Sequence, residues 1–312
     1  PNPAAVSAVV PGDQGLLSAL SPGSLWIEMS TTDAEDMRRY AAEAAERQID
    51  ALEAPVTGGV NRAWTGEISI LVGGEEAVFA RYKTLLAAMG GEIEHIGPIG
   101  AASIVKVITN MLAFVHLWAS GEALMLAKRA GVDLAKAYHG IRISSGNSFA
   151  HETEGQLVLN GSYNCAFTLA LAMKDFNLAL KLARETQTPL PVAELVEDIF
   201  TRAKDAYGDQ AWSTMAVKLL EDQLDEPLRA PGFPAVLPGS PAISASLNPT
   251  APTQSCSPTP RSTLSTTPCP TTCMSTLRSR RSKRASRCSA RSRSAWTPKM
   301  PRVCAPSTAE SL

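Results

Sequence analysis

Lys106 and Asn110 lie four residues apart in an apolar segment with helical periodicity. At this spacing, both side chains project from one face of a helix. A lysine among apolar neighbours either reaches solvent with its ammonium or meets an anionic partner, because burying an unpaired charge is costly. Burial also lowers the pKa of a lysine, which suits a group that exchanges a proton near neutral pH. The pair indicates either a proton-transfer site or a lysine that reaches solvent beside a structural asparagine.

The turn Thr57-Gly58-Gly59, which follows a predicted strand, is the second candidate element. Two adjacent glycines let a ligand approach the backbone closely, where N–H groups can bind an anion. For an isolated pair of glycines, an ordinary tight turn is the alternative. Taken together with Lys106 and Asn110, the turn favours an enzyme that holds a carboxylate with its backbone and moves a proton with an amine.

The elements that must position these residues change in type near residue 96. Residues 1–96 alternate predicted strands with helices, which is typical of an α/β layer. The expected strands are 25–27, 49–54, 68–72 and 92–96. Beyond residue 98 the periodicity is helical only, and the expected helices include 101–130, 166–187, 191–206 and 212–223. We therefore expect an α/β domain at residues 1–96 and an all-α domain at residues 97–229.

Residues 230–312 differ in composition from the rest of the chain. They carry 11 of the 29 Lys and Arg residues and 1 of the 30 Asp and Glu residues, a net charge of +10 against −11 for residues 1–229. Ser, Thr, Pro and Arg dominate, which predicts a disordered tail. Three interpretations are open: a basic arm that binds nucleic acid or membrane through residues 278–293, a solvated linker, or the product of a shifted reading frame. We favour the last.

Cysteine and histidine usage limits the remaining possibilities. Cys165 is the single cysteine of residues 1–229, so no disulfide framework is expected and a reduced, cytoplasmic protein is indicated. The four histidines are scattered, without metal-ligand spacing, and we expect no metal site. The longest apolar run, residues 111–118, is far shorter than a bilayer span, so we expect no membrane segment.

Several motifs, in order and in register over residues 1–229, resemble those of the β-hydroxyacid dehydrogenases, which include 3-hydroxyisobutyrate dehydrogenase and tartronate semialdehyde reductase. Ala54-Pro55-Val56-Thr57-Gly58-Gly59 is similar to the substrate-binding signature of that family. The further matching segments are Gly66 with Val72-Gly73-Gly74, Gly97-x-x-Gly100 with Lys106 and Asn110, Lys174-Asp175-Phe176, and Tyr207-Gly208 with Trp212-Ser213.

The resemblance implies a fold, a reaction and a set of roles. The fold would be an incomplete Rossmann-type NAD(P)-binding domain followed by a helical domain like that of 6-phosphogluconate dehydrogenase. The reaction would interconvert a small β-hydroxyacid and its semialdehyde or keto acid with NAD or NADP. Lys106 would be the general acid/base. Asn110 would be the second catalytic residue and, with Thr57, Gly58 and Gly59, would hold the substrate carboxylate. Lys174 would contact both substrate and cofactor, and Asn2 and Thr31 would line the nicotinamide end.

The beginning of the family pattern is missing from this sequence. The family starts with a strand, a Gly-x-Gly-x-x-Gly turn and a helix, and a later residue chooses between NAD and NADP. Gly12-Asp13-Gln14-Gly15 is not that turn, because no strand precedes it. We expect the chain to begin inside the nucleotide domain, to leave a sheet edge uncovered, and so to bind cofactor weakly and aggregate.

Two classes other than the dehydrogenase stay open at this point: a binding protein without catalysis, and a nucleic-acid-binding protein that acts through the tail. The sequence does not specify the hydroxyacid or the choice between NAD and NADP. We expect a homodimer or homotetramer through the all-α domain, because the long apolar helix at residues 101–130 needs more cover than one chain supplies.

Overall fold

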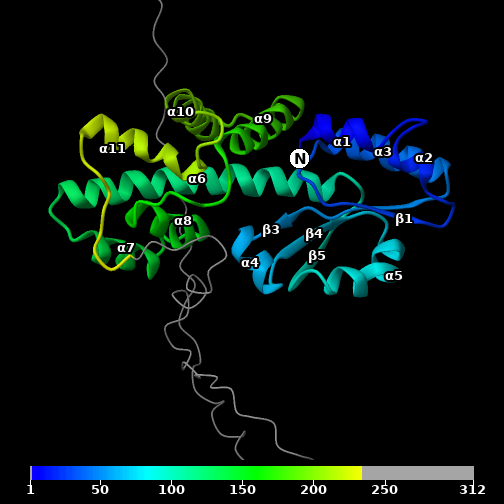
Figure 1. Ribbon diagram of the computed structural model, residues 1–312, viewed down its shortest axis with the longest axis horizontal. Helices are drawn as coiled ribbons and strands as arrows, with labels where there is room; N and C mark the ends of the chain where they lie inside the picture. Colours follow the sequence, from blue (N-terminus) through cyan, green and yellow to red (C-terminus); the bar gives the residue numbers. More distant parts are fainter. Residues whose placement is uncertain (1, 234–312) are drawn as a thin grey trace, which may run out of the picture. The chain divides into compact units, whose positions relative to one another are not determined.

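The computed structural model of the protein describes residues 2–233 (Figure 1). Its first part is built on a five-stranded sheet. The parallel pairs are β1 with β2 and β4 with β5, whereas β4 runs antiparallel to both β2 and β3. The sequence predicted all of these strands except the two-residue β3. Their bounds are β1 Leu25–Glu28, β2 Asp50–Glu53, β3 Val56–Thr57, β4 Ser69–Gly73 and β5 Glu92–Gly97.

The sheet separates two apolar cores. Trp26 of β1 packs with Met37 and Tyr40 of α3 on one face. Its neighbours Leu25 and Ile27 pack against the other core, which β2, β4 and α5 share, because successive side chains of a strand point to opposite faces. The helices of this part are α1 Pro3–Val9, α2 Leu16–Ala19, α3 Ala34–Glu46, α4 Gly59–Thr65 and α5 Glu76–Ala87. Figure 1 shows α1 to α3 on one side of the sheet and α5 on the other.

The second part is helical. Its central element is α6 (Ala101–Arg129), a helix of 29 residues around which the later helices pack (Figure 1). Phe114 of α6 contacts Phe176 of α9 and Phe200 of α10, with ring centroids 5.0 and 5.4 Å away. The other elements are α7 Leu134–Arg142, α8 Phe149–Leu159, α9 Leu169–Glu185, α10 Pro191–Tyr207, the 3-10 helix η1 Ser213–Ala216 and α11 Lys218–Leu224. The predicted succession of an α/β and an all-α region is confirmed.

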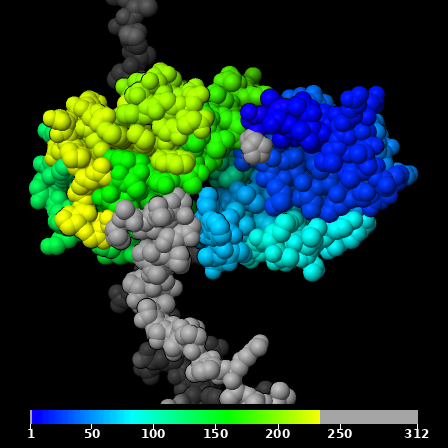
Figure 2. All heavy atoms as spheres, in the orientation of Figure 1, coloured from blue at the N-terminus to red at the C-terminus, as the bar shows by residue number. Residues whose placement is uncertain are grey.

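The helix α6 is long and apolar enough, by length and composition alone, to cross a membrane. It packs against α8, α9 and α10, and its residues Phe114, Leu117 and Leu124 belong to the main apolar core. These contacts are those of a core helix in an all-α domain. On the face shown in Figure 2, atoms of the sheet part (blue to cyan) meet atoms of the helical part (green to yellow) along one seam.

The described structure continues past the predicted boundary at residue 229. Ala230 is buried, and its N–H donates to the Leu159 carbonyl at 3.1 Å. Phe233 packs edge-on against Tyr138, with ring centroids 5.1 Å apart. The remainder of the predicted disordered tail, including the basic segment 278–293 and the five tail cysteines, lies outside the described residues.

Candidate active site

Lys106 lies inside the protein. Its side chain is on the sheet-proximal part of α6 and only 7% of its surface is exposed. The Nζ group donates a hydrogen bond to Asn110 Oδ1 at 2.8 Å, as their spacing predicts. Burial lowers the pKa of Lys106 to about 8, the charge of Lys174 acts in the same direction, and Asp175 opposes both. The alternative of a lysine that reaches solvent is therefore wrong.

A buried carboxylate on α9 completes this group. Asp175 is 1% exposed, and its Oδ2 accepts a hydrogen bond from Asn110 Nδ2 at 2.6 Å. The ammonium of Lys174 lies 2.8 Å from Asp175 Oδ1 and also donates to the Thr31 carbonyl at 2.9 Å. Lys106, Asn110, Asp175, Lys174 and Thr31 thus form one continuous polar chain. It runs from α6 through α9 to the loop after β1.

The structure gives Asp175 a contact that the sequence analysis did not anticipate. The residue was noted only as part of the Lys174-Asp175-Phe176 segment, without a role. The sequence did contain a signal for this contact. Asp175 lies one helical turn after Leu171 and one before Ala179, on the apolar side of α9. A carboxylate on the apolar face of a helix needs a polar partner, since burying it alone is costly.

A second buried carboxylate fixes the start of α6. Glu53, at the end of β2, accepts hydrogen bonds from the N–H groups of Gly100 and Ala102 at 2.7 and 2.8 Å, and one from the Ser103 hydroxyl. Free N–H groups and the helix dipole make a helix N-terminus a favourable place for a negative charge. Gly73 lies so close that a Cβ there would meet Glu53 Oε1 at 2.2 Å. The sequence analysis placed Glu53 at the end of a strand and gave it no role.

The Thr57-Gly58-Gly59 turn has the conformation that its glycines permit. Gly58 has φ of 119° and Gly59 has φ of 73°, values in the left-handed region that glycine tolerates best. A Cβ at Gly58 would also meet Arg62 Cδ at 2.7 Å. The helix α4 that follows reaches the helical part, because the Arg62 guanidinium lies 5.4 Å from the centre of the Phe149 ring on α8. Within residues 2–233, no hydrogen bond joins this turn to Lys106.

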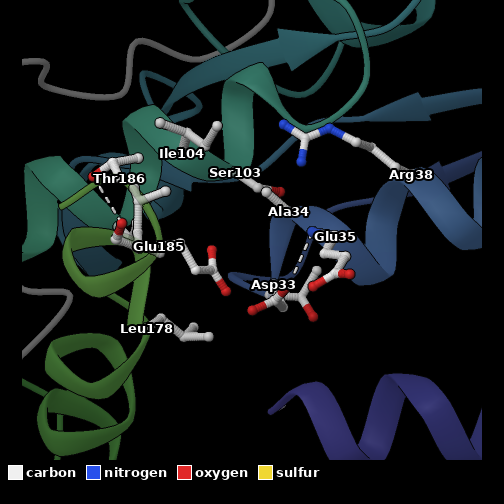
Figure 3. A pocket seen from close by; sticks show the side chains of 12 residues that line it. Asp33, Ala34, Glu35, Arg38, Ser103, Ile104, Leu178, Glu185 and Thr186 are labelled. Carbon is white, nitrogen blue, oxygen red and sulfur yellow. Dashed lines mark hydrogen bonds between the residues drawn. The ribbon is translucent and has the colours of Figure 1, made fainter. Parts of the chain in front are cut away.

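A cavity of about 240 Å³ lies beside the polar chain, between α3, α6 and α9. Figure 3 shows Asp33, Glu35 and Glu185 facing this space. The ammonium of Lys181, on α9, donates a hydrogen bond to the Asp33 carboxylate at 2.8 Å. The lining contains Ser103, Ile104 and Val107 of α6 but neither Lys106 nor Asn110, so the cavity opens on the neighbouring face of that helix.

Two family models match adjacent parts of the chain. Residues 1–97 match the NAD binding domain of 6-phosphogluconate dehydrogenase, and residues 100–220 match the NAD-binding model of NADP-dependent 3-hydroxyisobutyrate dehydrogenase. The 2-(hydroxymethyl)glutarate dehydrogenase of Eubacterium barkeri is 34% identical over 201 residues, which are 64% of this chain and 67% of that protein. The chain belongs to the β-hydroxyacid dehydrogenase family.

Other β-hydroxyacid dehydrogenases support this assignment. The L-threonate dehydrogenase of Escherichia coli K12 is 34% identical over 211 residues, 67% of this chain and 70% of that protein. The crystal structure of 3-hydroxyisobutyrate dehydrogenase from Salmonella typhimurium matches with a TM-score of 0.64 and 33% identity, covering 70% of this chain and 76% of that one. The protein is thus an NAD(P)-dependent oxidoreductase of the β-hydroxyacid class, and neither a non-catalytic binding protein nor a nucleic-acid-binding protein is favoured.

The family's cofactor is NAD or NADP. Of the three residues expected at its nicotinamide end, a hydrogen bond joins two. Lys174 bonds the Thr31 carbonyl. Asn2 lies outside this chain of contacts, since its side-chain oxygen accepts from the Ala5 N–H at 2.8 Å and caps α1. In the part of the chain that the structure describes, no strand pairs with the outer edge of β1 and no Gly-x-Gly-x-x-Gly turn follows a strand. Of the three residues expected at the nicotinamide end, the structure therefore brings Lys174 and Thr31 together and leaves Asn2 apart.

Proposed function

We propose that the protein interconverts a small β-hydroxyacid and its semialdehyde or keto acid, with Lys106 as the general acid/base. The observation that carries this proposal is the buried ammonium of Lys106, bonded to Asn110 at 2.8 Å. A pKa of about 8 leaves both protonation states populated near neutral pH, as proton transfer in both directions requires.

The cofactor, when bound, supplies the hydride chemistry. During oxidation, neutral Lys106 accepts the proton of the substrate hydroxyl; during reduction, the ammonium donates it to the carbonyl oxygen. Asn110 holds Lys106 through its oxygen and keeps one amide hydrogen for the substrate, because its NH2 group has two donors and Asp175 takes one. Lys174 likewise has three N–H donors, of which the Thr31 carbonyl takes one, while its ammonium forms an ion pair with Asp175.

The carboxylate of the substrate is assigned to the Thr57-Gly58-Gly59 turn. Two consecutive glycines with positive φ carry no Cβ, so an anion can approach the backbone N–H groups of this turn closely. The relatives are named for 2-(hydroxymethyl)glutarate, L-threonate and 3-hydroxyisobutyrate, which all carry a carboxylate and a hydroxyl group. A substrate with these two groups fits a carboxylate-binding turn opposite an amine.

The direct test is Lys106→Ala, assayed in the full chain against a panel of β-hydroxyacids at high NAD⁺ or NADP⁺ concentration. We expect kcat to fall at least about 100-fold, the lower range for loss of a general acid/base. Lys136→Ala is the matched control, because Lys136 is exposed on α7 and should be neutral. Turnover that survives in Lys106→Ala would refute the proposed role.

Calorimetry with NADH and NADPH tests the cofactor assignment separately and shows which of the two is preferred. It also tests the expectation of weak cofactor binding, which submillimolar affinity would contradict. We assign Thr31, Lys174 and Asn2 to the nicotinamide end, so Lys174→Ala should weaken the binding of the cofactor.

We further propose that residues 1–96 bind the cofactor, that residues 97–229 contribute to the substrate site and to self-association, and that the protein is cytoplasmic. The division falls at Gly97 and Gly100, whose φ values of 151° and 95° turn the chain from β5 into α6. Fluorescent tagging and fractionation would test the location in the cell.

The oligomer would form through α6. Ile108, Leu112 and Leu126 are 42, 46 and 72% exposed, and their spacing places them on one face of the helix, with Ala119 between them. An antiparallel second copy centred on Ala119 would set each Leu112 against Leu126 of the other chain. The same register places His116, a hydrogen-bond donor, beside the carboxylate of Glu122 in the second copy, and this pairing of donor with acceptor favours self-association over another partner.

A further inference from the structure

The orientation of the Asn110 amide depends on Asp175. Asn110 Oδ1 accepts from Lys106 Nζ, and Asn110 Nδ2 donates to Asp175 Oδ2 at 2.6 Å. An ionised carboxylate accepts hydrogen bonds only, and an ammonium donates only. A flipped amide would therefore set oxygen against oxygen and NH2 against ammonium. With Asp175 in place, one orientation is favourable at both ends, and it presents an oxygen to the lysine.

Asp175 also balances two positive charges. Lys106 and Lys174 share this buried region, and like charges disfavour each other's ionisation. Asp175 pairs directly with Lys174 at 2.8 Å and indirectly with Lys106 through Asn110. Of the influences on the pKa of Lys106, burial and Lys174 lower it and Asp175 alone raises it. Without the carboxylate, both remaining influences favour the neutral amine.

The same carboxylate links the lysine to the sheet part. Lys174 forms an ion pair with Asp175 and donates a hydrogen bond to the Thr31 carbonyl, so the loop after β1 is connected through Lys174 to Asp175 and then to Asn110. We propose that Asp175 is the positioning residue of this site: it fixes the amide of Asn110 and supplies the negative charge that keeps Lys106 able to protonate. This inference rests on the proposed role of Lys106.

The test is Asp175→Asn, which keeps the shape of the side chain and removes its charge. The kcat/KM for oxidation rises with pH as Lys106 becomes neutral, and in the variant this rise should move to lower pH by about one unit, the smaller end of the effect of a nearby opposite charge. Since the donor is the ammonium, the same shift from a pKa of about 8 should lower the kcat for reduction about twofold at pH 7 and about fivefold at pH 8. The KM for the carbonyl substrate should change less. A merely structural role would scale activity equally at every pH.

A measurement that does not need turnover separates this inference from the proposed function. The titration of Lys106 is followed by NMR in the full chain labelled with ¹³C at lysine Cε, its signal being assigned by its loss in Lys106→Ala. We expect the midpoint to fall in Asp175→Asn and to stay in Asp175→Glu. Asp205→Asn, an exposed change of the same charge on α10, should leave the midpoint unchanged.

The outcomes are distinct. A lowered midpoint together with a shifted rate profile supports both ideas, and a lowered midpoint in a protein without turnover supports the inference while removing the proposed function. An unchanged midpoint in folded Asp175→Asn overturns the inference, even where Lys106→Ala abolishes activity.

Discussion

Replacing Glu53 by Gln should destabilise the protein, because this carboxylate holds the first turn of α6. Three donors point at it: the N–H groups of Gly100 and Ala102 and the hydroxyl of Ser103. Hydrogen bonds to a charged group contribute about 1.5–3 kcal/mol each, against about 0.5–1.5 kcal/mol for neutral ones. Making three bonds neutral therefore removes about 3 kcal/mol. Part of this is offset, since a buried carboxylate carries a desolvation penalty that Gln lacks.

The net loss that we expect is about 2 kcal/mol, from the hydrogen bonds above less that offset. Urea unfolding followed by circular dichroism measures it, with an unchanged m-value as the sign that the folded state is retained. Glu76→Gln is the matched control: Glu76 lies in the first turn of α5 but is exposed, so its loss should cost less than about 1 kcal/mol. If Glu53→Gln were as stable as the unmodified protein, the desolvation cost of the carboxylate would equal the free energy that its charge adds to the three hydrogen bonds. The charge of Glu53 would then not be what anchors α6.

Two further predictions concern pH and assembly. Burial lowers the pKa of His151, so below about pH 6.5 the unfolded chain binds more protons than the folded one, and the free energy of unfolding should fall as the pH drops. In His151→Gln, the free energy of unfolding should depend less on pH in this range. An equal pH dependence in both proteins would contradict the prediction. Leu112→Glu should dissociate the oligomer, as measured by light scattering. Leu195→Glu is the control and should leave it intact, because Leu195 is equally apolar and 61% exposed but lies on α10. A monomeric unmodified protein would rule out the α6 interface.

The parts of the site that follow from local periodicity were predictable from sequence. The contact between Lys106 and Asn110 needs only helix geometry, and the turn at Thr57-Gly58-Gly59 needs only adjacent glycines after a strand. The structure adds to that turn the two-residue β3 before it and the short α4 after it. Helix propensity argues against an α4 that begins at a glycine, yet α4 begins at Gly59, with the left-handed Gly58 as its N-cap.

The two buried carboxylates illustrate what sequence patterns do not specify. Glu53 bonds residues 47 to 50 positions away, and Asp175 bonds Asn110 across 65 positions. Such contacts depend on how β2, α6 and α9 are placed by packing, and neither residue type nor spacing determines that placement. The antiparallel direction of β4 is similar, because it is a property of the sheet as a whole.

The two carboxylates together explain how the functional groups are held on both sides of the seam. Thr57 follows Glu53 by four residues, and Lys106 follows Ala102 by four residues. From the hydrogen bond between Glu53 and Ala102, the chain therefore runs about 13 Å in extended form to the turn proposed to bind the carboxylate and about 6 Å along α6 to the lysine. Since both tethers start at one buried contact, loosening Glu53 should misplace the turn relative to the amine. In Glu53→Gln, KM for the hydroxyacid should accordingly rise. The pH dependence of kcat/KM, which we attribute to Asp175 through its hydrogen bond with Asn110, should stay as it was.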